Sequence, residues 1–265
     1  MTDRYAVIGN PVAHSRSPWI HAEFARACGQ DLEYTRIAAP PDGFARAVGE
    51  FRAAGGKGLN VTLPFKLEAY RYCERVGAQA RAAEAVNTLS FGAVVQGDNT
   101  DGTGLVRDLA GNLGVELARR SVLLMGAGGA AQGVVGALLQ AGAARLVIAN
   151  RTLPKAQALA ARFSGAVACP YDALAGERFD VVVNATSAGL DGDAPPLPAG
   201  VMHGASVAYD MVYGRDTPFL AAARHAGARA CDGLGMLVEQ AAESFFIWRG
   251  VRPETAPVLR KLRAG

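Results

Sequence analysis

The sequence predicts an α/β protein whose second half forms a parallel, doubly wound sheet, preceded by a separate N-terminal region. Short apolar segments alternate with segments of helical periodicity, which is the pattern of strands joined by crossover helices. A glycine-rich turn at Gly126 to Gly129 directly follows one of these apolar segments. Because the segment before that turn starts only at Ser121, the preceding residues are left for another region.

Composition is typical of a globular α/β protein and excludes several other classes. Half of the 265 residues are hydrophobic, which allows one large domain or two modest ones. The net charge of +3 is spread evenly and argues against nucleic-acid binding, although a small anionic substrate is compatible with it. No segment approaches the roughly 18 apolar residues of a membrane span, and the N-terminus lacks the apolar core of a signal peptide.

Cysteine and histidine spacings indicate a cytoplasmic protein without a metal. Four cysteines are far apart and form no Cys-x-x-Cys pair, so we expect them to be reduced. The four histidines show no metal-binding spacing. These residues are Cys28, Cys73, Cys169 and Cys231, and His14, His21, His203 and His225.

The N-terminal region is expected to alternate strands and helices. Ser17 followed by Pro18 predicts a helix start, since a hydroxyl N-cap often precedes proline at the first helical position. Asp42 is expected to cap the next helix, and Gly29 and Gly55 to end these two helices. The predicted strands are 5–8, 32–37, 58–61 and a hairpin of 86–91 with 94–97, and the predicted helices are 17–28, 42–55, 65–73, 78–85 and 99–113.

The second half repeats the pattern with more strongly apolar strands. Val122 to Met125 is read as a buried strand that turns into a helix at Ala130. Two helices close the chain after the last strand. The predicted strands are 122–125, 145–149, 180–184, 206–210 and 228–231, and the predicted helices are 130–141, 154–163, 218–226, 235–248 and 254–263.

The glycine turn is a candidate phosphate site. A tight strand-to-helix turn directs backbone N–H groups and the positive end of a helix dipole toward one point. The spacing is Gly-x-Gly-x-x-Ala, a variant that the dinucleotide fingerprint allows. Glycine-rich turns that bind nothing are also common, so this motif alone leaves both interpretations open. The residues concerned are Gly126, Ala127, Gly128, Gly129 and Ala130.

The end of the next predicted strand favours NADP over NAD. Asn150, Arg151 and Thr152 follow that strand, with Lys155 three residues further on. NAD sites usually place a carboxylate here for the ribose 2′-hydroxyl, and none is present. Arginine, a hydroxyl and lysine are instead suited to a 2′-phosphate. The alternative is a solvated basic turn that opens a helix.

A second polar group follows the predicted strand at 58–61. Asn60, Thr62 and Lys66 lie within one short segment, and polar groups at strand carboxyl ends face the ligand crevice of open α/β sheets. Pro64 and Phe65 would partly desolvate Lys66, and a desolvated lysine can act as a general acid or base. The alternative is a surface lysine at a helix start.

Other polar residues remain open between structural and functional roles. Asp101 would serve equally well as an N-cap, and Ser15 and Ser17 as turn and cap residues. Gln240 lies on a predicted helix, where a lone amide is usually exposed. The remaining residues of this kind are Asn87, Thr88, Asn99, Thr100, Asn184, Thr186 and Ser187.

Taken together and in order, these motifs closely resemble the shikimate dehydrogenase family over nearly the whole chain. The motifs are His14-Ser15-Arg16-Ser17-Pro18, residues 60–66, Ala85-Val86-Asn87-Thr88, residues 97–102, residues 126–130, Asn150-Arg151-Thr152, residues 184–187, and Gly233-Leu234-Gly235-Met236 through Gln240.

The resemblance implies a two-domain α/β fold and an oxidoreductase. Residues 1–101 and 236–265 would form a substrate-binding domain, completed by the returning C-terminal helices, and residues 102–235 a Rossmann domain that binds NADP. The implied reaction is the reversible NADPH-dependent reduction of 3-dehydroshikimate to shikimate in the chorismate and aromatic amino-acid pathway. The expected partner is this small molecule, not nucleic acid or membrane, and the oligomeric state stays open between monomer and homodimer.

The resemblance also implies a role for each matched residue. Lys66 and Asp101 match the catalytic pair, Ser15 and Ser17 would bind the substrate carboxylate, and Tyr213 would flank the substrate. Thr62, Asn87 and Gln240 would hold the ring hydroxyls, with Asn60 nearby, and Gly235 and Met236 would pack near the nicotinamide. The cofactor set is completed by Gly126, Ala127, Gly128, Gly129, Ala130, Asn150, Arg151, Thr152, Lys155, Asn184, Thr186 and Ser187.

One departure and two alternatives accompany this prediction. The family often carries arginine where Lys155 stands, so the preference for NADP is expected to be milder. The first alternative is an NAD(P)-dependent quinate/shikimate dehydrogenase. The second is a non-catalytic NADP-binding sensor with the same fold, which the presence of both Lys66 and Asp101 disfavours.

Overall fold

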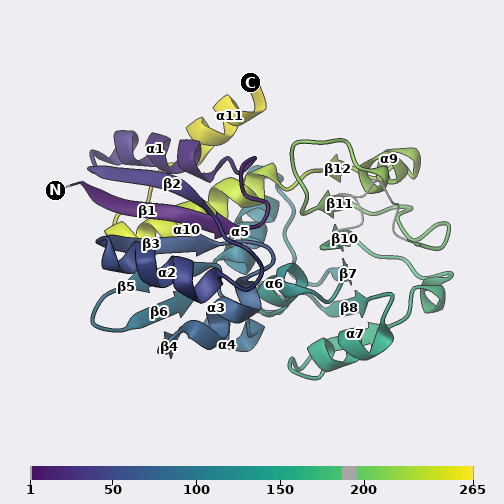
Figure 1. The fold of residues 1–265 in the computed structure, drawn as a ribbon. Coiled ribbons are helices and arrows are strands. Elements are labelled where there is room, and N and C mark those ends of the chain that lie inside the picture. Colours follow the sequence, from purple (N-terminus) through teal and green to yellow (C-terminus); the bar gives the residue numbers. More distant parts are fainter. Residues whose placement is uncertain (1, 187–195, 265) are drawn as a thin grey trace. The chain divides into compact units, whose positions relative to one another are not determined.

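The computed structural model describes residues 2–186 and 196–264, and the chain divides into two compact units (Figure 1). The first unit is formed by Met1–Gly104 together with Leu237–Gly265, and the second by Leu105–Met236. The first unit is therefore built from both ends of the chain, and the second is a continuous insertion.

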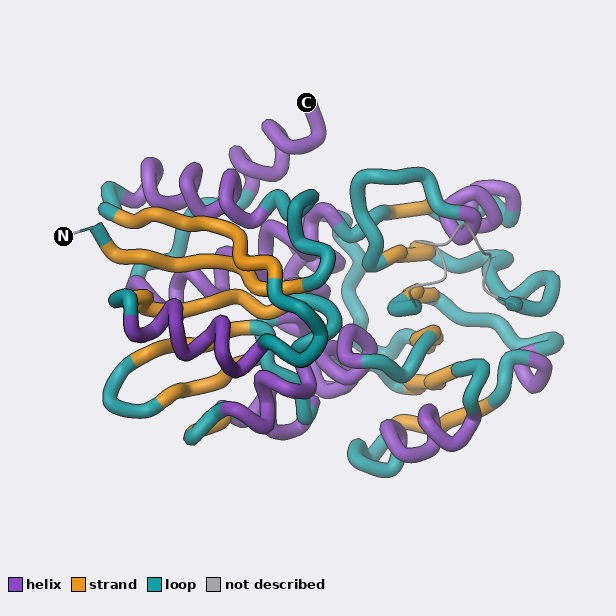
Figure 2. Tube along the Cα trace, viewed as in Figure 1, coloured by secondary structure: helices purple, strands orange, loops and turns teal. Residues whose placement is uncertain are grey.

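The first unit contains a six-stranded mixed sheet in the order β2-β1-β3-β5-β6-β4, whose strands are labelled in Figure 1. Figure 2 draws the strands in orange. Its parallel part pairs β1 (Asp3–Gly9) with β2 (Leu32–Ala38) and with β3 (Gly56–Val61). The predicted hairpin is confirmed, because β5 (Thr88–Phe91) runs antiparallel to β6 (Val95–Asp98) and to β3. The two-residue strand β4 (Arg75–Val76), which pairs with β6, was not predicted because it is too short to show periodicity.

Helices pack on both faces of this sheet because successive side chains of a strand point to opposite faces. Ala6 and Ile8 of β1 belong to a core cluster with Phe44 of α2. Tyr5 and Val7 point to the other face and cluster with Tyr34. The helices of this unit are α1 (Ser17–Cys28), α2 (Phe44–Ala53), α3 (Lys66–Tyr72), α4 (Ala78–Ala83), α10 (Leu234–Arg249, which begins in the second unit) and α11 (Ala256–Ala264).

The second unit contains a fully parallel sheet in the order β12-β11-β10-β7-β8-β9 (Figure 1). Strand β7 is the first of these in the sequence, and the next strands extend the sheet first on one side and then on the other. This confirms the predicted doubly wound fold, and it places the topological switch point between β7 and β10. The strands are β7 (Ser121–Met125), β8 (Arg145–Ala149), β9 (Ala166–Cys169), β10 (Val181–Asn184), β11 (Val207–Asp210) and β12 (Ala230–Cys231).

Both faces of this second sheet are covered, which explains its unbroken apolar strands. Leu124 and Ile148 pack on one face with α5, α6 and α7, and Leu123 and Val147 pack on the other face with α9. The elements that flank the sheet are α5 (Asp101–Arg107, which begins in the first unit), the π-helical turn η1 (Asp108–Asn112), α6 (Gly129–Gln140), α7 (Leu153–Ala160), the 3₁₀ turn η2 (Asp172–Leu174) and α9 (Pro218–His225).

The structure corrects two predicted helix caps. Ser17 is the first residue of α1, and Arg16 occupies the N-cap position without a side-chain hydrogen bond. Gly43 takes the N-cap position of α2 in place of Asp42. In both cases the chain turns into the helix one residue away from the polar side chain, so that side chain is free for other contacts. Within the described residues, no helix combines the length and apolar character needed to cross a bilayer.

Candidate functional site

The first unit brings Lys66 and Asp101 into contact, although they lie 35 positions apart in the sequence. Lys66 opens α3 after β3, and Asp101 opens α5 after β6. Lys66 Nζ lies 2.5 Å from Asp101 Oδ2, and the two side chains are only 13% and 6% exposed. Screening by water is weak at such an ion pair, so the carboxylate strongly orients the ammonium group. Lys66 is therefore not the exposed surface lysine of the alternative interpretation.

Asn87 holds the other oxygen of this carboxylate. Its Nδ2 donates to Asp101 Oδ1 over 2.9 Å, and its Oδ1 accepts the backbone N–H of Thr100, also over 2.9 Å. Gln240 of α10 contributes its Oε1, 3.4 Å from both Asn87 Nδ2 and Thr100 Oγ1. The polar residues predicted from three separate motifs thus converge around Asp101.

Asn60 is buried next to Asn87, and its side-chain amide bonds to other residues of the protein interior. Its Nδ2 donates to the backbone oxygen of Asn87 over 3.2 Å and to Ser244 Oγ over 2.9 Å. Its Oδ1 accepts the hydroxyl of Tyr34 over 2.7 Å. These contacts make Asn60 a link between β2, β3, the start of β5 and α10.

The two predicted carboxylate-binding serines are buried and bonded to each other. Ser15 Oγ donates to Ser17 Oγ over 3.2 Å and accepts the backbone N–H of Ser17 over 3.3 Å. The guanidinium of Arg36 on β2 donates twice to the backbone oxygen of Ser15, at 2.6 and 3.1 Å. Thr62, half-buried, follows β3, and its N–H donates to the backbone oxygen of Ile8 over 2.9 Å.

His21 is a buried titratable residue of this unit. The sequence analysis mentioned it only among the four histidines that lack a metal-binding spacing. Its ring is 0% exposed and stacks on Tyr34, with centroids 4.2 Å apart and planes 6° from parallel. Neither ring nitrogen has a hydrogen-bond partner among the described residues. Burial lowers the pKa of His21 to about 3.

In the second unit, the glycine turn has the geometry that a pyrophosphate requires. Gly126 has a φ of +105°, and a Cβ there would lie 3.1 Å from the backbone oxygen of Ala185, so only glycine fits without strain. Gly128 is the N-cap of α6, and no acidic residue occupies the first turn of that helix. Ala127 is buried and Gly128 is exposed. These residues fit a dinucleotide phosphate at the helix N-terminus, beside the switch point of the sheet.

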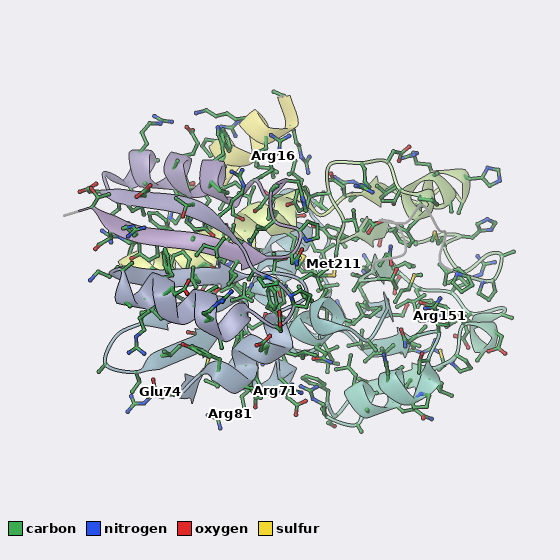
Figure 3. The ribbon with its side chains drawn as sticks, viewed as in Figure 1. Arg16, Arg71, Glu74, Arg81, Arg151 and Met211 are labelled. Carbon is green, nitrogen blue, oxygen red and sulfur yellow. The ribbon has the colours of Figure 1, made fainter. Side chains whose placement is uncertain are left out.

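The basic residues after β8 are exposed, as a 2′-phosphate site requires. Arg151, Thr152 and Lys155 are all exposed, and Asn150 Nδ2 donates to the backbone oxygen of Thr152 over 2.9 Å. Figure 3 shows Arg151 on this unit. No acidic side chain is hydrogen-bonded to Arg151 or Lys155 among the described residues. These residues therefore fit a phosphate of the adenosine ribose.

A buried carboxylate, Asp210, ties together the loops after β10 and β11. It accepts hydrogen bonds from Asn184 Nδ2 at 3.2 Å, from the N–H of Val212 at 3.0 Å and from the hydroxyl of Thr217 at 2.6 Å. Burial raises the pKa of Asp210. Asn184 in turn accepts both the N–H and the hydroxyl of Thr186. Ser187, also predicted to bind the cofactor, lies outside the described residues.

The start of α10 is held within the second unit by Tyr209. Its hydroxyl donates to Asp108 Oδ2 over 2.6 Å and accepts the N–H of Met236 over 3.2 Å. A Cβ at Gly235 would overlap the Asp108 carboxylate, which explains the glycine. Tyr213 also belongs to this unit and is half-buried in the loop after β11.

Several residues of the site escaped the sequence prediction. Tyr34 and Arg36 lie two positions apart on β2, where they have the pattern of ordinary strand residues. Ser244 carries a usable signal, because it lies four residues after Gln240 and therefore on the same face of α10. Asp108 and Asp210 are buried acidic residues, and their burial is decided only by tertiary packing.

Comparisons with known proteins identify similar chains over nearly the whole length. Three family models match: the shikimate dehydrogenase substrate binding domain over residues 7–89, shikimate / quinate 5-dehydrogenase over residues 108–190, and the shikimate 5′-dehydrogenase C-terminal domain over residues 233–263. A protein of Nitrosospira multiformis named shikimate dehydrogenase (NADP(+)) is 60% identical over 270 residues, which cover 100% of this chain and 98% of that protein.

Solved structures of similar proteins superpose over the full length. An Ael1 enzyme from Pseudomonas putida has a TM-score of 0.94 at 51% identity, with 98% of each chain covered. Shikimate 5-dehydrogenase of Thermus thermophilus, solved in complex with NADP(H) and shikimate, has a TM-score of 0.89 at 35% identity, with 99% of each chain covered. The matched models and the high identity over the full length show that this chain belongs to the shikimate dehydrogenase family.

Proposed function

We propose that this chain catalyses the reversible NADP-dependent reduction of 3-dehydroshikimate to shikimate, as a cytoplasmic enzyme of the pathway to chorismate and the aromatic amino acids. Relatives named shikimate dehydrogenase (NADP(+)) that are 55% and 60% identical cover the whole chain. The observation that carries the proposal is the buried Lys66–Asp101 pair with Asn87 and Gln240 beside it. Cys28, Cys73 and Cys169 carry free thiols, which supports the cytoplasm.

Lys66 supplies the proton in this reaction. NADPH, when bound, supplies the hydride that reduces the ketone carbon, and the ketone oxygen must then gain a proton. The ammonium of Lys66 has three protons, of which one is committed to Asp101 Oδ2. Ionised Asp101 has no proton to donate, and both of its oxygens accept hydrogen bonds. Lys66 therefore polarises and protonates the ketone oxygen, and Asp101 orients it.

The first unit supplies the groups that hold the substrate. Ser17 Oγ accepts from Ser15, so the proton of Ser17 is left to donate to the substrate carboxylate. Thr62, Asn87 and Gln240 hold the ring hydroxyls, with Asn60 supporting them from behind. Tyr213 flanks the substrate. Residues 1–101 and 236–265 are thereby assigned as the substrate-binding domain.

Residues 102–235 are assigned as the NADP-binding domain. The turn at Gly126 to Ala130 holds the pyrophosphate, and Arg151, Thr152 and Lys155 hold the 2′-phosphate, with Asn150 shaping the loop. The remaining cofactor contacts are assigned to Asn184, Thr186, Ser187, Gly235 and Met236. The reaction requires neither a nucleic acid nor a membrane as partner, and a monomer or homodimer accommodates it equally.

Two variants and a matched control test this proposal. Lys66→Ala and Asp101→Asn are expected to lower kcat for 3-dehydroshikimate reduction by about 10²- to 10⁴-fold, the usual contribution of general acid–base catalysis, while KM changes little. Turnover is followed by the loss of NADPH absorbance. Lys57→Ala removes an exposed lysine of β3 and should leave kcat unchanged. Near-normal turnover in Lys66→Ala would refute the role of Lys66. If the unchanged protein oxidised quinate with NAD faster than shikimate with NADP, the quinate/shikimate alternative would be favoured.

A further inference from the structure

Two hydroxyl groups behind Asn87 are completely shielded from solvent. Thr88, the first residue of β5, and Ser244, on α10, are both 0% exposed. Thr88 Oγ1 lies 2.9 Å from Asn87 Oδ1 and 2.8 Å from Ser244 Oγ. Their burial rules out contact with a ligand in solution, so any effect on the reaction passes through their neighbours.

The direction of these hydrogen bonds follows from groups that can act only one way. The Asp101 carboxylate only accepts, so Asn87 must present Nδ2 to it and Oδ1 to the opposite side. There Oδ1 accepts the N–H of Thr100 and the hydroxyl proton of Thr88. With its proton committed to Asn87, Thr88 Oγ1 can only accept from Ser244 Oγ, 2.8 Å away. A single orientation of the Asn87 amide is compatible with all of these partners.

Ser244 extends the same logic to the C-terminal helix. It accepts Asn60 Nδ2 over 2.9 Å and gives its own proton to Thr88 Oγ1 over 2.8 Å. Asn60 must offer Nδ2 to the backbone oxygen of Asn87, so its Oδ1 faces Tyr34, which therefore donates. The network thus runs in one direction from Tyr34 toward Asp101.

We propose that Thr88 and Ser244 are positioning residues that set the orientation of the Asn87 amide, and through it the hydrogen bond to Asp101. This inference rests on the proposed function, in which Asp101 orients Lys66. Neither hydroxyl touches the substrate. Thr88 acts directly on Asn87 Oδ1, and Ser244 donates to Thr88 Oγ1, which keeps the proton of Thr88 directed at Asn87.

Loss of the Thr88 hydroxyl is expected to change catalysis as well as stability. The hydrogen bond from Asn87 fixes the position of the Asp101 carboxylate that contacts Lys66, so a misplaced amide displaces the Lys66–Asp101 pair. Among the described residues, Lys66 from α3 is the charged group in contact with Asp101, and the uncharged Asn87, which precedes β5, bonds the other carboxylate oxygen. The value of kcat therefore reports the placement of Asn87.

The test replaces Thr88 by the isosteric valine in the full-length chain. Thr88→Val is expected to lower both kcat and kcat/KM for 3-dehydroshikimate about five- to tenfold, the worth of one ordinary hydrogen bond. Thr88→Ser keeps the hydroxyl and should restore both. Ser90→Ala is the matched control two residues along the same strand, since it deletes a hydroxyl that has no hydrogen-bond partner among the described residues.

The outcomes separate this inference from the proposed function. If Asp101→Asn is inactive while Thr88→Val matches Ser90→Ala in kcat and in kcat/KM, the positioning role is refuted and the catalytic pair stands. If Asp101→Asn retains normal turnover, both the positioning role and the proposed role of the Lys66–Asp101 pair are refuted. Should Thr88→Val fold too poorly to purify, Ser244→Ala is expected to lower kcat by a smaller factor, and an unchanged kcat in that variant overturns the proposal.

Discussion

Replacing His21 by phenylalanine should make the protein more resistant to mild acid. The imidazole is fully buried against Tyr34, and no described residue bonds to its nitrogens. Phenylalanine keeps a flat ring in the stack and loses no hydrogen bond. Any packing strain that it adds is the same at every pH, so it cancels when one protein is compared at two pH values.

The magnitude follows from the pKa of His21, which burial lowers to about 3, against about 6.5 in the unfolded chain. Above pH 6.5 both states are neutral and the histidine contributes no pH dependence. Below pH 6.5 the unfolded state gains a proton that the folded state does not, so stability is lost steadily until about pH 3. At about 1.4 kcal/mol per pH unit, the loss attributable to His21 between pH 6.5 and pH 5.0 is about 2 kcal/mol.

The assay is urea denaturation followed by circular dichroism at pH 7.5 and pH 5.0. The free energy of unfolding should fall by about 2 kcal/mol less in His21→Phe than in the unchanged chain. Burial raises the pKa values of Asp98 and Asp210, but these groups titrate alike in both proteins and cancel in the comparison. His225→Gln, at an exposed position of α9, should leave the pH dependence as it is.

Equal pH dependence in His21→Phe and the unchanged chain would refute this reasoning. It would mean that the folded protein protonates His21 near the ordinary pKa, which requires water or a conformational opening at a ring that the structure shows as completely enclosed.

The remaining predictions concern the second unit. Arg151→Ala should lower kcat/KM with NADPH about ten- to a hundredfold and leave kcat/KM with NADH nearly unchanged, because it removes a charge-assisted bond to the 2′-phosphate alone; equal losses with both cofactors would contradict that assignment. Asp210→Asn should cost about 1–3 kcal/mol in the free energy of unfolding, because an amide cannot accept from Asn184, Val212 and Thr217 as a carboxylate does; unchanged urea denaturation would show that these bonds carry little energy.

Much of the fold was predictable because local patterns and tertiary packing agree. The unbroken apolar strand Val122 to Met125 predicted burial on both faces, and β7 is buried at both. Prediction failed where the sequence pattern was very short or was compatible with more than one local structure. Strand β4 has two residues, and Ser17 before Pro18 has the pattern of an N-cap although the helix already includes it. The predicted helix 99–113 is α5 followed by a π-helical turn, which no periodicity distinguishes.

Of the candidate site, the sequence by itself determined which kinds of residue are available and which family they resemble. The motif at 60–66, Asp101, the glycine turn and the basic residues after β8 are all readable, because each is a short local pattern. The family comparison confirms the resemblance that these motifs suggested.

Only the tertiary structure decided how those residues work together. The ion pair of Lys66 and Asp101 joins the starts of two helices, and Ser244 reaches Asn60 from 184 positions away in the sequence. Burial, hydrogen-bond direction and the lowered pKa of His21 depend on neighbours that the chain assembles only on folding. Local sequence determines the conformation of a segment, whereas the surroundings of a side chain are set by segments that are distant in the chain.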